Sequence, residues 1–314
     1  MSNTYNLYLV IIDGHNKKYY NIFMELRELR YFLAVAREES ISRAAESLFI
    51  TQPNLSRQMQ NLERETGQKL FIRGNRKVSL TPAGMLLRKR AEEILELHDK
   101  TFNELNAPKT EICGDIYIGG GESYAMQIIA KAARAVRDEH PAVRFHLFSG
   151  DSTTIAERLD KGLIDFGVFI GVRDLSRYDS LRLPLSDTWG VLMRKDSPLS
   201  QKEKISPEDL WDKQLLLSRQ TLGKSGVTEW FNKPVEELNV VGTGNLLYNT
   251  SLLVKEGLGY AVTLDKIINT TGDSDLCFRP LYPDLISHLE IAWKKHEAFS
   301  RCAEVFLEKL RNLI

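Results

Sequence analysis

The chain has 314 residues and 42 Lys+Arg against 42 Asp+Glu, so its formal net charge is zero and its sequence pI is near 7.0. This length predicts two or more domains, and 43% hydrophobic with 27% charged residues exclude a disordered chain or a collagen-like repeat. A neutral average argues at first against a nucleic-acid partner, because such a partner requires a positive surface facing its phosphates.

The N-terminal segment, residues 1–23, precedes Met24, where a clear helical pattern begins. Its apolar run from Asn6 to Ile12 is seven residues long and is followed by Asp13. That run is too short for a signal peptide or a membrane span, and no other stretch approaches the ~20 apolar residues that a span requires. We therefore expect a cytoplasmic protein with no membrane partner. Residues 1–23 are interpreted as an extension, either an upstream start or a flexible arm.

The cysteines and histidines give no sign of a metal site. Cys113, Cys277 and Cys302 are far apart and in no CxxC spacing, so neither a disulfide framework nor a zinc site is predicted. The six histidines also lack ligand-like spacing, and GxSxG, HExxH and P-loop motifs are missing. We therefore predict no metal, no other cofactor and no catalytic residue, which disfavours an enzyme. Redox sensing by Cys113 and Cys277 stays an alternative to spare thiols.

The neutral total conceals two oppositely charged regions. Residues 24–90 hold 13 Lys+Arg and 7 Asp+Glu, a net charge of +6, whereas residues 91–314 hold 27 and 34, a net charge of −7. Residues 1–23 contribute the remaining +1. A basic head on a larger acidic body suggests a nucleic-acid-binding module joined to a module of another kind.

Three short helices are predicted in the basic head. The first begins at Met24, with apolar residues at spacings of three and four. Ser42 is interpreted as the N-cap of a second helix over residues 43–48, and a third helix starts near Pro53, a residue type favoured in a first helical turn. Two short helices joined by a tight turn are typical of a helix-turn-helix, whose second helix enters the major groove.

The third helix has a polar and basic outer face. Gln, Asn, Ser and Arg side chains lie near its start, and no acidic residue precedes Glu63. Arg can pair with guanine, and Gln or Asn with adenine. A solvated helix face is the alternative for such a run.

A β-hairpin is predicted after this helix, from two short extended runs around Gly74-Asn75. Its Arg73, Arg76 and Lys77 could reach a phosphate backbone, as the wing of a winged helix does. Solvated side chains are the alternative here too.

Several blocks of the head resemble the LysR-type transcriptional regulator family, in order and in spacing. They are Leu29-Arg30-Tyr31-Phe32, Ser42-Arg43-Ala44-Ala45, Thr51 to Gln58, Leu62-Glu63, Leu70 to Arg73 and Leu80 to Gly84. The resemblance implies a winged helix-turn-helix domain over residues 24–81 that binds double-stranded DNA. The predicted DNA-binding residues are Ser42, Gln52, Pro53, Asn54, Ser56, Arg57, Gln60, Arg73, Arg76 and Lys77.

Residues 82–110 are predicted to form a long linker helix and a hinge. The helix lacks internal Pro, and residues from Leu87 to Leu105 recur at heptad-like spacings of three and four. By resemblance this helix pairs across a homodimer, which can assemble further into a homotetramer. A solvated surface helix is the alternative. Two-fold pairing predicts an operator that is an imperfect inverted repeat.

The acidic body, residues 111–314, is predicted to be an α/β domain with two lobes. From Ile112 to Ile170 short β-rich runs alternate with helical ones, and the helical runs include Glu122 to Asp138 and Thr153 to Lys161. A second α/β set follows, with one strand from Trp189 to Arg194. The crossing points are expected near residue 171 and after residue 263. Lobe I then comprises about 111–171 and 265–314, and lobe II about 172–264. Such a pair resembles a periplasmic binding protein, which closes around a small molecule.

The effector is expected at the carboxyl ends of the strands, where loops lead into helix N-termini. Hydroxyls and helix-terminal N–H groups there suit a small anion such as a carboxylate, and Arg219 could contact it in a bidentate manner. Each Ser or Thr has a plain helix cap as its alternative, and Arg219 a surface position. The predicted effector-binding residues are Ser123, Tyr124, Ser152, Thr153, Ser218, Arg219, Thr243, Asn245 and Thr263.

Taken together, the sequence predicts an N-terminal α winged helix-turn-helix with a long linker helix and a C-terminal α/β, two-lobed effector domain. By its resemblance to LysR-type regulators, it is expected to bind promoter DNA as a dimer or tetramer and to respond to a small-molecule effector. The acidic body alone could also be interpreted as a solute receptor, but a receptor would not carry the basic head.

Overall fold

The computed structural model describes residues 9–13, 16–20, 24–74, 77–106, 108, 110–171, 174–222, 226–296 and 298–314; for residues 9–20 and for Arg73 it describes the backbone alone. The chain divides into two compact units, Met1–Phe102 and Asn103–Ile314, and each has its own hydrophobic core. In this described part of the chain, no helix has the length and apolarity that crossing a membrane requires.

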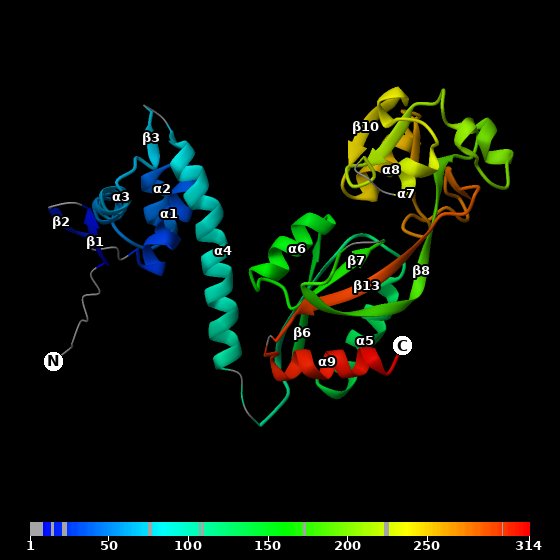
Figure 1. Ribbon diagram of the computed structural model, residues 1–314. Coiled ribbons are helices and arrows are strands. Elements are labelled where there is room, and N and C mark those ends of the chain that lie inside the picture. The colour runs from blue at the N-terminus through cyan, green and yellow to red at the C-terminus, as the bar shows by residue number, and fades with distance from the viewer. Residues whose placement is uncertain are drawn as a thin grey trace. The chain divides into compact units, whose positions relative to one another are not determined.

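Among its described residues, the first unit contains four helices, preceded by a two-stranded antiparallel sheet (Figure 1). The strands of this sheet are β1 (Leu9–Asp13) and β2 (Asn16–Tyr20), which lie within the N-terminal extension. The helices are α1 (Leu26–Glu38), α2 (Ile41–Ser47), α3 (Gln52–Thr66) and α4 (Pro82–Leu105). Between α3 and α4, β3 (Phe71–Arg73) pairs antiparallel with β4 (Val78–Leu80). This is the helix-turn-helix with a wing that the sequence predicts.

Small residues allow the elements of the first unit to approach closely. Ala44 and Ala45 of α2 are buried in the core, beside the fully buried Phe32 of α1 and Leu55 of α3. Gly84 lies in the first turn of α4, where a Cβ would overlap the carbonyl oxygen of Leu70. The long helix therefore begins pressed against the backbone just before the wing.

One nine-stranded sheet runs through the second unit, in the order β10-β9-β11-β8-β13-β7-β5-β6, with β12 paired to β8. Its strands are β5 (Gly114–Gly120), β6 (Val143–Ser149), β7 (Phe166–Ile170), β8 (Tyr178–Arg194), β9 (Leu215–Ser218), β10 (Val240–Gly244), β11 (Tyr260–Leu264), β12 (Leu276–Pro280) and β13 (Ile286–Lys294). Strands β5, β6 and β7 pair in parallel, as do β9, β10 and β11, which confirms the predicted α/β class.

Helices cover both faces of the sheet in each lobe (Figure 1). In lobe I, α5 (Met126–Glu139) and α9 (Arg301–Arg311) pack on one face, and α6 (Ser152–Asp160) packs on the other. In lobe II, α7 (Gly226–Trp230) and α8 (Leu247–Lys255) belong to two separate core clusters. The described part of the second unit also has 3-10 turns at Pro198–Gln201, Pro207–Asp209 and Val235–Glu237.

The two lobes are joined by β8, which is seventeen residues long. Its first half pairs with β13 in lobe I, and its second half pairs with β11 and β12 in lobe II. At the start of the lobe II half, Gly190 lies so close to Phe278 that any Cβ would overlap the Phe278 ring. The chain thus passes between the lobes inside a continuous strand.

Three details differ from the sequence expectations. Ser40, not Ser42, caps α2, because its side chain accepts the N–H of Arg43, while Ser42 lies inside the helix. Helix α5 begins at Met126, so residues 122–125 form a loop, not the first turn of a helix. The return to lobe I comes after Leu281 and not near residue 264, because β12 pairs with β8 and its Cys277 packs in the lobe II core.

Candidate functional site

The first two turns of α3 present a polar surface. Of the predicted groove residues, Ser56 is half-buried, and the others on this helix are exposed: Gln52, Pro53, Asn54, Arg57 and Gln60. The opposite face of the helix is anchored by Leu55, Met59 and Leu62, all buried. Within the described chain, the Arg57 side chain has no hydrogen-bond or ion-pair partner. Its guanidinium can therefore bind a base edge or a phosphate. Ser42, on α2, is also exposed.

The wing contains a charge pair that the sequence did not reveal. Lys77 Nζ lies 2.6 Å from Glu39 Oε2, and the Val78 N–H donates to the Glu39 carbonyl at 2.9 Å. Hydrogen bonding and charge from Lys77 hold the pKa of the Glu39 carboxyl below its usual range. Glu39 therefore connects the end of α1 to the wing. It also forms an ion pair with Lys77, which is one of the residues predicted to bind DNA phosphates. Arg73 lies in β3, and Arg76 lies outside the described residues.

Replacing Glu39 with Gln is expected to strengthen DNA binding at low salt by about two- to fivefold, because Lys77 is released and a carboxylate is removed from the wing that is predicted to contact DNA phosphates. Fluorescence anisotropy titrations at several salt concentrations would measure the change. The matched control is Glu38→Gln, which removes the same charge from a residue that pairs with Arg37 instead of the wing. Equal gains in both variants would contradict a specific role for the Glu39–Lys77 pair.

Glu63 joins the recognition helix to the wing. It is 8% exposed, and its Oε1 accepts the N–H groups of Leu70 (2.9 Å) and Phe71 (3.2 Å), while Lys69 Nζ lies 3.0 Å from Oε2. Burial opposes its ionisation, but these hydrogen bonds outweigh burial and lower its pKa. The sequence signal that could have identified Glu63 is its position, because it is a charged residue on the inner side of an amphipathic helix. The arrangement fixes where the wing starts relative to α3.

The second unit contains a cavity of about 780 Å³ between its two lobes. Four of the predicted effector residues line it: Ser152 from lobe I, and Ser218, Asn245 and Thr263 from lobe II. The structure thus brings together residues from four separate loops and strand ends. The apolar part of the wall includes Ile170, Trp189 and Leu247.

The other five predicted effector residues do not line this cavity. Ser123 and Tyr124 line a second, smaller cavity of about 370 Å³. Thr153, Thr243 and Arg219 are exposed, and Arg219 uses its backbone N–H to bind the Gly244 carbonyl at 3.1 Å. The arginine that does line the large cavity is Arg182, on β8. The sequence pattern predicts a strand only from Trp189 onward, so it does not indicate Arg182, which lies seven residues earlier in the longer β8.

The charged lining of the large cavity is mixed. It includes Arg182 together with Glu122, Glu229 and Glu290, and the His288 imidazole lies in the same wall. Ser180 Oγ donates to Glu290 Oε2 at 2.7 Å, whereas the Arg182 guanidinium has no hydrogen-bond or ion-pair partner in the part of the chain that the structure describes. Arg182 is therefore available to an anionic group inside the cavity.

Residues 121–125, between β5 and α5, form a loop that borders both cavities. We call this segment the interlobe loop. The Glu122 carboxylate accepts the backbone N–H of Leu247, at the start of α8 in lobe II. Ser123 Oγ donates to Asp187 Oδ2 at 2.5 Å, and Lys266 Nζ lies 5.1 Å from the centre of the Tyr124 ring. Asp187 is 3% exposed, and burial raises its pKa.

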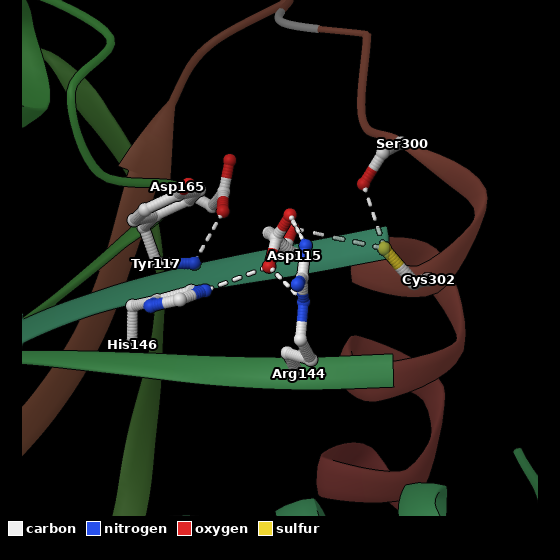
Figure 2. Close-up of polar contacts among 7 residues, drawn as sticks. All are labelled: Asp115, Tyr117, Arg144, His146, Asp165, Ser300 and Cys302. Carbon is white, nitrogen blue, oxygen red and sulfur yellow. Dashed lines mark hydrogen bonds and ion pairs between the residues drawn. The ribbon is translucent and has the colours of Figure 1, made fainter. Parts of the chain in front are cut away.

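A polar cluster surrounds Asp115 near the start of β5, at the opposite end of that strand from the interlobe loop (Figure 2). Arg144 Nε and Nη2 each donate to the Asp115 carboxylate at 2.8 Å, and His146 Nε2 lies 2.7 Å from Oδ1. The Tyr117 ring stacks on His146 with 4.6 Å between ring centres.

Cys302 lies against the same strand, 3.8 Å from the Asp115 carbonyl oxygen, with Ser300 Oγ 3.2 Å from its sulfur (Figure 2). Burial raises the pKa of the Cys302 thiol, which keeps it protonated and unreactive. All three cysteines are free. In the described residues, no group of three or more His, Cys, Asp and Glu side chains could hold a metal ion. The contacts of Asp115 with Arg144 and His146 join β5 to β6.

Comparison with known proteins gives two family matches that together span most of the chain. Residues 26–85 match the model for the bacterial regulatory helix-turn-helix protein of the lysR family, and residues 109–313 match the LysR substrate binding domain. The relatives include the Hca operon transcriptional activator HcaR of Escherichia coli strain K12, which is 30% identical over 279 residues, covering 87% of this chain and 93% of HcaR. An uncharacterized HTH-type transcriptional regulator of Bacillus subtilis strain 168, YybE, is 26% identical over 285 residues, covering 90% of this chain and 97% of YybE.

The solved structures with similar folds include full-length CbnR complexed with its target DNA. CbnR is 20% identical, with a TM-score of 0.73 over 93% of this chain and all of that one. CbnR without DNA, described as a LysR family transcriptional regulator, gives a TM-score of 0.74, also at 20% identity, over 92% of this chain and 99% of that one. The fold of both units and the two family matches agree. The chain belongs to the LysR family of DNA-binding transcriptional regulators, with an effector-binding domain behind its helix-turn-helix.

Proposed function

We propose that this regulator binds an inverted-repeat operator as a homodimer or homotetramer and changes promoter output when a small molecule enters the interlobe cavity. The observation that carries the DNA half of the proposal is the exposed surface of Gln52, Asn54, Arg57 and Gln60 on α3, where the Arg57 side chain has no partner among the described residues. HcaR is an operon activator and CbnR was solved on its target DNA, which supports the same role here. The function is thus regulation and not catalysis, in the cytoplasm where the DNA lies.

Pairing of two copies is supported by an exposed apolar stripe on α4. Leu86, Ile94, Leu97 and Leu105 are all exposed, and at 3.6 residues per turn they fall within about 100° of one another. Exposed apolar side chains on one side of a helix favour a covering surface, and a second copy of the same helix supplies one by two-fold symmetry. Two recognition helices are then held together, which is why the operator is expected to be an inverted repeat.

Replacing Arg57 with Ala is expected to weaken binding to the operator by ~1–3 kcal/mol, because a base contact is lost. The measurement is a gel-shift or anisotropy titration against the intergenic DNA beside the gene, with random DNA of equal length. Arg64→Ala is the matched control: it removes the same charge from the same helix, three turns from its start, where Arg64 binds Asn61 at 3.0 Å.

The expected pattern is a loss of operator preference in Arg57→Ala and a small, sequence-independent loss in Arg64→Ala. Equal losses of Arg57→Ala on operator and random DNA would make Arg57 a phosphate contact. A wild-type protein that retards no DNA at low salt would overturn the proposed function itself.

The effector half of the proposal rests on the lined cavity and on Arg182 inside it. Thermal-shift screening of the full chain against small mono- and dicarboxylates should identify stabilising ligands, since a ligand at 100 times its dissociation constant adds ~2.7 kcal/mol. Ser218→Ala, in the cavity wall, is expected to reduce the shift, whereas Thr153→Ala, outside the wall, should leave it unchanged. A ligand-induced thermal shift that is reduced only in Thr153→Ala would show that the effector binds outside this cavity.

A further inference from the structure

Three consecutive residues of the interlobe loop hold three different parts of the second unit. Glu122 reaches the start of α8 in lobe II, Ser123 binds Asp187 within the strand that joins the lobes, and Tyr124 lies beneath Lys266 just after β11. The loop itself belongs to lobe I, because it follows β5 and leads into α5. A rotation of one lobe against the other must therefore break or carry along each of these contacts.

Glu122 supplies a contact that α8 lacks within its own lobe. The N-cap residue of α8 is Leu246, which has no side chain able to accept a hydrogen bond, and no side-chain cap is made there. The N–H of Leu247 instead donates to Glu122 across the cavity. A carboxylate at a helix N-terminus is stabilised both by the hydrogen bond and by the helix dipole. Lobe I thus caps a helix of lobe II.

We propose that the interlobe loop is a latch, in which Glu122 holds lobe II against lobe I when the cavity is empty. The proposal rests on the proposed function, since the latch regulates the same cavity. Glu122 and Leu247 both line that cavity, so a bound molecule meets the latch directly. Any molecule that binds the latched and unlatched arrangements unequally must shift the population between them.

The test is an interlobe distance measured in the full chain without effector or DNA. Spin labels at exposed Glu157 of lobe I and exposed Glu208 of lobe II would report it by double electron–electron resonance. Cys113 is only partly buried, so the labelled chain carries Cys113→Ser, whereas Cys277 and Cys302 are buried and are kept. The labelled chain is diluted with unlabelled chain so that distances between subunits do not contribute. The variants are Glu122→Ala and Glu122→Gln.

The matched control is Asp151→Ala. Asp151 caps α6 by accepting the N–H of Thr154 at 2.7 Å, but both residues lie in lobe I. Each Ala variant therefore removes a carboxylate from a helix N-terminus, and only Glu122→Ala removes it between lobes. Glu122→Gln keeps an oxygen acceptor and loses the charge, so it tests the latch even if the Ala variant folds poorly.

The expected result is a wider interlobe distance distribution in Glu122→Ala, with the unlatched fraction relative to the latched one raised on the order of tenfold, as loss of a helix cap implies. Glu122→Gln should shift less, and Asp151→Ala should keep the wild-type distribution. An unchanged distribution in both Glu122 variants, or the same widening in Asp151→Ala, would overturn the latch. Neither outcome touches the proposed regulation, which the DNA titrations test separately.

Discussion

Replacement of Phe166 by Ala is expected to lower the free energy of unfolding of the second unit by about 3–5 kcal/mol. Phe166 lies at the start of β7 and is fully buried. Its ring stacks on Phe299 at 5.1 Å between centres, lies 5.2 Å from Phe306 and meets the edge of Trp293 at 6.2 Å. The substitution loses both the transfer free energy of the ring and the contacts of these aromatic neighbours, because a β-sheet core relaxes only partly around a cavity.

Urea unfolding followed by tryptophan fluorescence would measure this loss selectively. All four tryptophans, Trp189, Trp211, Trp230 and Trp293, belong to the second unit. The control is Phe49→Ala, since Phe49 is 96% exposed and lies in the first unit. That variant should leave the fluorescence transition where it is in the wild type. A loss below about 1 kcal/mol for Phe166→Ala would show that the aromatic cluster repacks.

Local patterns were sufficient for the helix-turn-helix and the wing. The periodic apolar residues, the Pro in the first turn of α3 and the short extended runs of the wing each act within a few residues, so they can be read from the chain directly. Even in this domain one prediction was wrong, the N-cap residue of α2. Ser40 and Ser42 are equally good capping residues, and Ser40 caps α2 because α1 ends at Glu39 in a left-handed conformation with a φ of 50°.

Contacts between distant residues decide the features that the sequence left open. Glu122 and Ser123 looked like the start of a helix, but their partners, Leu247 and Asp187, lie 125 and 64 residues away and hold the loop open. Strand β8 also depends on distant partners, because its two parts pair with strands from different lobes. Only the part in lobe II contains a run of consecutive buried residues, from Gly190 to Met193. Pairing partners of this kind are not visible in local spacing, which is also why Arg182 was missed.

Replacement of Asp115 by Ala is expected to cost the second unit about 3 kcal/mol near neutral pH. Breaking a buried ion pair by removing one partner costs ~3–5 kcal/mol, and the low end applies because Arg144 and His146 are 66% and 46% exposed and can rehydrate. Asp115 itself is only 6% exposed at its side chain. The matched control is Asp138→Ala, an aspartate paired with Arg134 one helical turn away on the surface of α5, which should cost well under ~1 kcal/mol.

The pH dependence of the Asp115 effect has a definite sign. Burial opposes ionisation of Asp115, but the hydrogen bonds and charges of Arg144 and His146 outweigh burial and lower its pKa (Figure 2). A carboxyl whose pKa is lower in the folded than in the unfolded state contributes its stability above the unfolded value, ~3.9 for aspartate, and loses it as the pH falls through the folded value. Urea unfolding at a series of pH values would give the free energy of unfolding of the wild type and of Asp115→Ala. The difference between these two free energies should therefore have its largest value from about pH 6 upward and become smaller below about pH 4. A difference that stays constant down to pH 3 would mean that Asp115 stabilises the fold through packing and not through its charge.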